Sequence, residues 1–159
     1  IKTELSLLKK VGAKIKVAKK QIEISGPKKI KNISNLVTKE YPNFPTDLQA
    51  QFMVLLCKAK GKSSITESIF ENRFMHVAEL RRLGAEILIK KNKAYISGDT
   101  NFQAAELMSS DLRASVALVL AAIVAKGSSI INRIYHLDRG YENIENKLKK
   151  VGVKIRRIS

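Results

Sequence analysis

The sequence predicts a mixed α+β fold assembled from a repeated unit. A leucine, two basic residues, an apolar residue and a glycine follow one another at 8–12, 80–84 and 148–152. The glycines of these segments lie 72 and 68 residues apart, and the same order of predicted elements surrounds each of them. A fixed period of this length is typical of one supersecondary unit that is repeated along the chain.

Each copy of this motif is predicted to end an amphipathic helix, because glycine readily adopts the left-handed conformation of a helix C-cap. A stretch with strand-like alternation follows each time, and after the first two copies a short turn leads into a second strand. These pairs predict β-hairpins. The first hairpin pairs 14–17 with 21–26, and the second pairs 86–89 with 93–98. The strand predicted at 153–158 has no partner strand.

A second helix is predicted inside each full unit. Thr46 and Gln49 have the spacing of a capping box, in which each side chain bonds the backbone N–H of the other residue. Ser110 begins the corresponding helix 64 residues after Thr46. The first of these helices is predicted to end at Gly61 and to be followed by a strand at 63–66. The second is predicted to end at Gly127 and to be followed by a strand at 128–131.

The predicted unit therefore has the order β-α-β-α-β-β. We interpret 1–159 as a single lobe that holds the last part of one unit at 1–40 and two following units at 41–98 and 99–159, the last of them one strand short. An open strand edge is a liability that folded domains normally cover. We therefore expect the lobe to be truncated at both ends and completed by further chain.

Composition excludes several classes of protein. Apolar residues make up 45% of the 159 residues, which is enough for a core and excludes a disordered chain. The single cysteine excludes an internal disulfide framework and favours a reducing, cytoplasmic setting. The longest apolar run, within 112–125, is too short for a membrane span, and no signal peptide is predicted.

The net charge of +16, from 30 basic and 14 acidic residues, favours an anionic partner. A basic nucleic-acid-binding module is the alternative that this charge leaves open. Against it, the chain has no tryptophan and no interleaving of aromatic and basic residues of the kind that stacks on bases. Most lysines, such as Lys14, Lys16, Lys19 and Lys20, fall in predicted strands and turns and are expected to form a solvated face.

Two acids and three arginines are the candidate site residues. Asp47 and Asp111 each follow a predicted N-cap residue, where a carboxylate either stabilises the helix dipole by roughly 0.3–1 kcal/mol or acts as a general base. Arg113 begins an almost wholly apolar helix, and because an unpaired cation is costly there, it should face a cleft or an acid. Arg139 and, 66 residues earlier, Arg73 lie in matching loops before helices, where basic side chains suit phosphate or carboxylate groups.

The remaining chemical side chains are expected to be structural. His76 and His136 have no ligand partner three or four residues away, so no metal site is predicted, and no cofactor is expected. Cys57 falls late in an apolar helix and is expected to be a small core residue.

Four segments closely resemble the UDP-N-acetylglucosamine enolpyruvyl transferases. They are YPNFPTDLQAQF at 41–52, ITESIFENRFMHVAELRRLGA at 65–85, DLRAS at 111–115 and RIYHLDRGYENIE at 133–145. The resemblance extends over essentially the whole chain. FENRFMH and RIYHLDRGY are less similar to the shikimate-pathway enolpyruvyl transferases, which are the related alternative.

The resemblance implies a fold and a reaction. Members of the family have two lobes, each an inside-out α/β barrel of three β-α-β-α-β-β units around a pseudo-threefold axis, with the active site between the lobes. This chain resembles most of the C-terminal part. In the family, phosphoenolpyruvate adds to the 3′-hydroxyl of UDP-N-acetylglucosamine and phosphate leaves from a tetrahedral ketal, the first committed step of peptidoglycan synthesis.

The resemblance also implies roles for individual residues. Asp47 matches the carboxylate that contacts the sugar 3′-hydroxyl and takes its proton. Ile69 lies where the family contacts the uridine nucleotide through its backbone. Arg113 and Arg139 match arginines on the phosphoenolpyruvate side of the cleft.

Arg73 and Asp111 match further cleft residues of the family. The family's flexible loop, with its Cys or Asp proton donor, lies in the other lobe together with a lysine that binds phosphoenolpyruvate. This chain alone is therefore expected to be inactive. The expected partners are the two small-molecule substrates and the missing N-terminal lobe, with no nucleic acid and no membrane.

Overall fold

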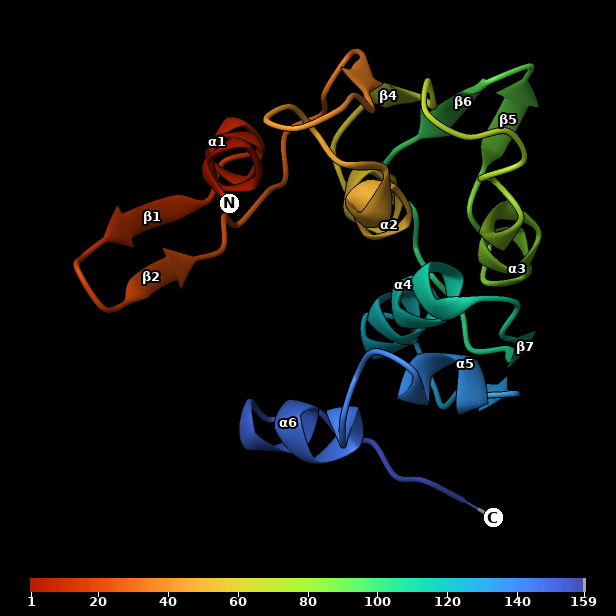
Figure 1. The fold of residues 1–159 in the computed structure, drawn as a ribbon. Coiled ribbons are helices and arrows are strands. Elements are labelled where there is room, and N and C mark those ends of the chain that lie inside the picture. The colour runs from red at the N-terminus through yellow and green to blue at the C-terminus, as the bar shows by residue number, and fades with distance from the viewer. Residues whose placement is uncertain (159) are drawn as a thin grey trace.

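Up to residue 132, helices and strands follow one another in the order that the repeat predicts (Figure 1). A computed structural model describes residues 1–158. Its elements are α1 (Lys2–Lys10), β1 (Lys14–Val17), β2 (Ile22–Ser25), β3 (Leu36–Val37), the 3₁₀ turn η1 (Thr46–Leu48), α2 (Gln49–Cys57), β4 (Lys62–Thr66), α3 (His76–Arg82), β5 (Ile87–Lys90), β6 (Lys93–Ser97), β7 (Glu106–Met108), α4 (Leu112–Ile123), β8 (Ile130–Asn132), α5 (Tyr135–Asp138) and α6 (Ile144–Lys150).

The strands form three separate sheets: the hairpin β1-β2, a four-stranded sheet of order β3-β4-β6-β5, and the pair β7-β8. Both predicted hairpins are confirmed, since β1 pairs antiparallel with β2 and β5 with β6. The strands on either side of each long helix pair in parallel, β3 with β4 and β7 with β8. Parallel strands need a crossover between them, and α2 and α4 provide it.

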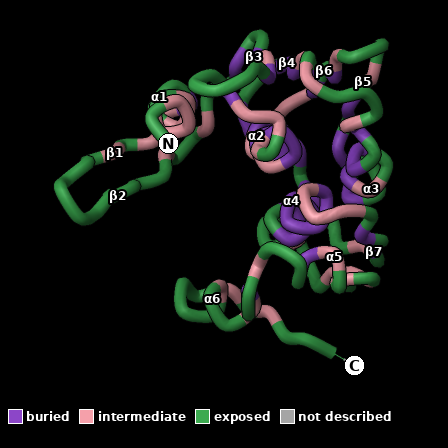
Figure 2. The backbone as a smooth tube through the Cα atoms, in the orientation of Figure 1, coloured by how far each residue is buried: buried purple, intermediate pink, exposed green. Residues whose placement is uncertain are grey.

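The core lies around these two crossover helices. Met53 and Leu56 of α2 and Leu118 of α4 are completely buried, and α2 packs directly against α4. Figure 2 shows buried residues gathered in α2, α3 and α4, whereas the β1-β2 hairpin and much of α6 are exposed. Burying each large apolar side chain stabilises this arrangement by about 1.5–3 kcal/mol. No helix within residues 1–158 has the length and apolar character needed to cross a membrane.

The three glycines of the repeated motif share one conformation. Gly12, Gly84 and Gly152 have φ of 109°, 97° and 91°, in the left-handed region that other residues rarely adopt. After Gly84, the Ala85 N–H donates to the Leu80 carbonyl at 3.0 Å and closes the end of α3. The C-caps predicted at these three glycines are therefore confirmed. The ends predicted at Gly61 and Gly127 are wrong, because α2 and α4 end four residues earlier, at Cys57 and Ile123.

The strand predicted at 153–158 does not form. This segment runs as extended coil beyond α6 (Figure 1). A strand needs a neighbour to satisfy its backbone N–H and C=O groups, and residues 1–158 supply none here. Arg157 is instead held through its side chain, which donates to both carboxylate oxygens of Asp138 at 2.9 and 2.6 Å.

The predicted capping box at Thr46 is also wrong. The chain enters α2 through the 3₁₀ turn η1, and no side chain caps either element. The Thr46 hydroxyl instead donates to Glu67 Oε2 at 2.8 Å. The hydroxyl that the local sequence assigns to the helix cap therefore bonds to a buried carboxylate instead.

Cys57 is confirmed as a core residue, with no exposed surface. Burial raises the pKa of its thiol from 9.0 to about 12, and a hydrogen bond with Thr100 opposes the shift. Because the thiolate is the reactive form, we expect Cys57 to react with thiol reagents about a thousand-fold more slowly in the folded protein than in the unfolded protein. Peptide mapping after labelling at pH 8, with and without urea, measures the ratio; equal labelling would contradict the burial.

Candidate active site

Asp47 lies within η1, at the entrance to α2, and its side chain is 61% exposed. Its Oδ1 accepts a hydrogen bond from Arg113 Nε at 2.6 Å. Arg73 supplies a second guanidinium, whose Nη2 lies 3.9 Å from the same oxygen. One carboxylate thus lies between two cations. We refer to Asp47, Arg73 and Arg113 as the Asp47 cluster.

Arg113 meets the expectation that a cation in an apolar helix faces an acid. It lies in the first turn of α4, and its partner Asp47 comes 66 residues earlier. Asp111 was expected to follow the N-cap residue but is itself the N-cap. Its Oδ1 accepts from the N–H groups of Arg113 at 2.8 Å and Ala114 at 3.0 Å. The cap therefore fixes the backbone from which the Arg113 side chain extends.

Arg73 lies in the turn between β4 and α3. Its guanidinium carbon is 4.5 Å from the centroid of the Phe70 ring, and the side chain is only 22% exposed. A cation–π contact of this kind contributes about 0.5–1 kcal/mol at an exposed site. The guanidinium is thus held by an aromatic face as well as by the charge of Asp47.

Ile69 is half-buried in the same turn. Its N–H donates to Glu67 Oε1 at 2.9 Å, so a ligand that contacts the Ile69 backbone would meet its carbonyl. Residues 67–75, together with Ile89, Lys91 and Asn92, line a hollow of about 960 Å³. This is the size of a small-molecule site, and both Ile69 and Arg73 belong to its lining.

Arg139 was predicted to lie at the entrance to a helix, and this prediction is wrong. The short helix α5 precedes it, and Arg139 is the C-cap residue of that helix, with an exposed side chain. A Cβ placed on Gly140 would lie 2.9 Å from Leu112 Cδ2, so this loop lies tightly against the start of α4, next to Arg113. Within residues 1–158, no ion pair or hydrogen bond joins the Arg139 side chain to the Asp47 cluster.

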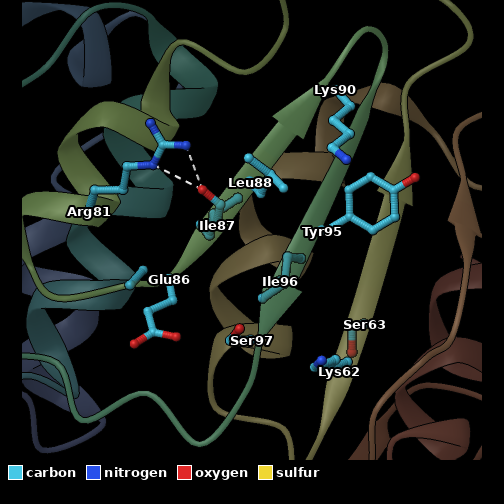
Figure 3. Close-up of a pocket in the computed structure, with 11 residues that line it drawn as sticks. Lys62, Ser63, Arg81, Glu86, Ile87, Leu88, Lys90, Tyr95, Ile96 and Ser97 are labelled. Atoms are coloured by element: carbon cyan, nitrogen blue, oxygen red, sulfur yellow. Dashed lines mark hydrogen bonds between the residues drawn. The ribbon is translucent and has the colours of Figure 1, made fainter.

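A second hollow of about 520 Å³ lies against the four-stranded sheet (Figure 3). Its lining includes Lys62, Lys90, Tyr95 and Arg81, and none of the predicted site residues. Arg81 donates to the Ile87 carbonyl through Nη2 at 2.5 Å and Nε at 3.0 Å, as Figure 3 shows. Because the Arg81 guanidinium already donates two hydrogen bonds to a backbone carbonyl, the Asp47 cluster is the better candidate for an active site.

His76, at the start of α3, is only 3% exposed. Burial lowers the pKa of its imidazole from 6.5 to about 4, and the negative charge of Asp111 opposes the shift. The unfolded chain therefore binds more protons than the folded chain between these two values. It follows that His76 makes the free energy of unfolding fall as the pH drops from 6.5 towards 4.

We expect this decline to reach about 1.4 kcal/mol per pH unit for His76. Urea titrations at pH 7, 5.5 and 4.5 measure it, and the His76→Gln variant should show a shallower decline because glutamine does not titrate. Parallel declines in the native protein and the variant would show that His76 is not the group responsible.

Glu67 is the residue that sequence reasoning missed. Its side chain is buried and accepts four hydrogen bonds, two from backbone N–H groups of the turn that carries Ile69 and two from threonine hydroxyls outside that turn. A single acid after a strand matches no motif. The only signal was a charged residue between Thr66 and Ser68, directly after a predicted strand.

Comparison with known proteins identifies the class of protein. The family model described as EPSP synthase (3-phosphoshikimate 1-carboxyvinyltransferase) matches residues 1–148, so the chain belongs to this family of enolpyruvyl transferases. The solved enolpyruvyl transferase NikO from Streptomyces tendae superposes with a TM-score of 0.88 at 26% identity, over 98% of this chain and 36% of that one. An EPSP synthase from Acinetobacter baumannii shares the fold, with a TM-score of 0.79 at 17% identity over 98% of this chain and 39% of that one. The predicted fold class is confirmed.

Within the family, the chain is similar to one particular enzyme. It is 67% identical to UDP-N-acetylglucosamine 1-carboxyvinyltransferase of Pelagibacter ubique and 52% identical to that of Desulfosudis oleivorans, over all 159 residues in each case. It spans 38% of the length of each relative. The resemblance seen in the sequence is confirmed, and the nucleic-acid-binding alternative finds no support.

Proposed function

We propose that the chain is the C-terminal part of an enzyme that transfers the enolpyruvyl group of phosphoenolpyruvate to the 3′-hydroxyl of UDP-N-acetylglucosamine. The hydroxyl oxygen bonds to C2 of phosphoenolpyruvate while the hydroxyl proton leaves and C3 gains a proton. The tetrahedral intermediate then loses phosphate and a C3 proton, which restores the methylene group. The reaction thus needs a base, an acid and cations that hold phosphate and carboxylate groups.

Asp47 is the base in this proposal. The observation that carries it is the position of this exposed carboxylate between Arg113 at 2.6 Å and Arg73 at 3.9 Å. Charge-assisted bonds fix the direction of a carboxylate and so place a base for proton transfer. Asp111 supports the same geometry as the N-cap of α4.

The arginines are the anion-binding groups. Two guanidinium groups outnumber the one carboxylate of the Asp47 cluster, so the cluster carries a net positive charge. We assign Arg113 and Arg139 to phosphoenolpyruvate, since the Arg139 loop lies against the start of α4. Ile69 and Arg73 are assigned to the nucleotide side, because both line the hollow of about 960 Å³.

We propose that the rest of the site is supplied by a part of the protein outside these 159 residues, which span 38% of the length of the relatives. We propose that residues 1–40, 41–98 and 99–159 are parts of three successive units of one lobe, and that the other lobe supplies the proton donor. We place the reaction in the cytoplasm and expect it to need no metal or cofactor.

The test uses a full-length protein in which residues 1–159 replace the matching segment of the Pelagibacter ubique relative. With phosphoenolpyruvate and UDP-N-acetylglucosamine, we expect this full-length protein to release phosphate continuously. With 3-phosphoshikimate as the acceptor, we expect no release. Release with 3-phosphoshikimate and none with the sugar nucleotide would contradict the proposal. Residues 1–159 alone should show no turnover with either acceptor.

A further inference from the structure

Glu67 is an acid in the interior, and its side chain contacts several separate segments. It lies directly after β4 and is 2% exposed. An ionised carboxylate is costly to bury unless donors replace the water that it loses. The groups around Glu67 supply these donors, and they belong to segments far apart in the sequence.

Four donors reach the carboxylate. Oε1 accepts from the Thr38 hydroxyl at 2.8 Å and from the N–H groups of Ile69 at 2.9 Å and Phe70 at 3.2 Å. Oε2 accepts from the Thr46 hydroxyl at 2.8 Å. All four donors are neutral, so the carboxylate serves as a fixed acceptor for hydrogen bonds.

The backbone of Glu67 is fixed as well. Its N–H donates to the Asn92 carbonyl at 2.8 Å, and its own carbonyl accepts from Asn92 Nδ2 at 3.0 Å. Asn92 lies at the turn of the β5-β6 hairpin. The backbone that carries the carboxylate is therefore attached to the four-stranded sheet.

The two oxygens of Glu67 bond to the two segments that carry Asp47 and Arg73. Thr46 directly precedes Asp47, so the bond to Oε2 holds the segment that carries the proposed base. Ile69 and Phe70 begin the turn that leads to Arg73, so the bonds to Oε1 hold the segment that lines the hollow.

We propose that Glu67 is a positioning residue that sets the Asp47 segment and the 69–73 turn against each other. It does not touch the reacting atoms. It acts through Thr46 on the base and through the backbone N–H groups of Ile69 and Phe70 on the nucleotide side. This inference rests on the proposed function for its kinetic consequence, whereas its structural consequence stands without it.

The chain offers a matched pair of variants. Thr46→Val and Thr38→Val each remove one 2.8 Å hydrogen bond to the same carboxylate, but only Thr46 adjoins Asp47. In the full-length protein, we expect Thr46→Val to lower kcat at least ten-fold and to leave both KM values within two-fold. Thr38→Val also removes the bond that the Thr38 hydroxyl accepts from the Ser68 N–H at 2.9 Å, so it should lower Tm at least as much, while kcat stays within two-fold of native. An equal effect of the two variants on kcat would show that Glu67 is merely structural.

Glu67→Met tests the nucleotide side. Its side chain has no carboxylate oxygen, so the N–H groups of Ile69 and Phe70 lose their acceptor. We expect hydrogen exchange at the Ile69 and Phe70 amides to become at least ten-fold faster and KM for UDP-N-acetylglucosamine to rise. Unchanged exchange in a folded variant would overturn the inference, and if this variant does not fold, the threonine pair decides it.

The two proposals fail in different ways. If the native full-length protein releases no phosphate, the proposed function is wrong, and the exchange rates at Ile69 and Phe70 still decide the role of Glu67. If the native protein is active and Thr46→Val leaves kcat unchanged, the inference about Glu67 alone is wrong.

Discussion

Replacing Asp47 with asparagine should lower kcat of the full-length protein by about 100-fold or more, because the amide cannot take the proton of the 3′-hydroxyl. The amide oxygen can still accept the bond from Arg113 that Oδ1 accepts at 2.6 Å, so the geometry of the site should survive. We therefore expect KM for UDP-N-acetylglucosamine to stay within about three-fold of native. Steady-state phosphate release measures both constants.

The alanine variant adds a second effect. Asp47→Ala leaves Arg113 without its partner, so turnover should fall at least as far while nucleotide binding weakens far less. Asp99→Asn is the control, because Asp99 is exposed and has a φ of 55°, which asparagine tolerates well. A kcat for Asp47→Asn within three-fold of native would refute the role of Asp47 as the base.

Replacing Gly98 with alanine should destabilise the protein by roughly 3 kcal/mol or more, or prevent folding. The new Cβ would lie 1.9 Å from the Ala59 carbonyl oxygen and 2.4 Å from that of Gly61. Both atoms belong to the backbone, and both accept hydrogen bonds at the end of β6, Gly61 from Gly98 at 2.9 Å and Ala59 from Asp99 at 2.8 Å. Relief of the clash would therefore break the contact between β6 and the end of α2.

Gly26 provides the matched control for this substitution. A Cβ on Gly26 would meet nothing within 4 Å, and its backbone lies outside the left-handed region. Gly26→Ala should therefore change the free energy of unfolding by less than about 1 kcal/mol. Urea unfolding of the full-length variants compares the two, and equal stability of both would contradict the close approach at Gly98.

The sequence predicted the order of the elements well because each unit carries its own local signals. Glycines after α1, α3 and α6, and alternating residues beside short turns, are interactions between near neighbours. The failures arose where a distant partner decides the outcome. The segment 153–158 alternates like a strand but has no neighbouring strand among the described residues. The Thr46 hydroxyl bonds to Glu67, 21 residues away, and so does not cap the helix.

The candidate site was predictable in part. Asp47 and Arg113 could be singled out as charged groups at helix entrances, and the cost of an unpaired cation predicted that Arg113 meets an acid. Which acid it meets depends on the packing of α2 against α4, which no local pattern encodes. The sequence did not predict helix α5, which ends at Arg139, so this residue was wrongly placed at a helix entrance. Its loop nevertheless lies beside α4, because Gly140 permits a close approach to Leu112.

The bond between Asp47 and Arg113 joins segments that we assign to two successive units of the repeat, so the candidate site depends on how firmly α2 and α4 stay together. Partial opening between α2 and α4 would separate the Asp47 carboxylate from the Arg113 guanidinium while the sheets and hairpins on either side remain folded. In repeat architectures, the interface between units and the units themselves contribute separately to stability. Rising denaturant should therefore abolish turnover at a lower concentration than it abolishes the circular dichroism of the helices.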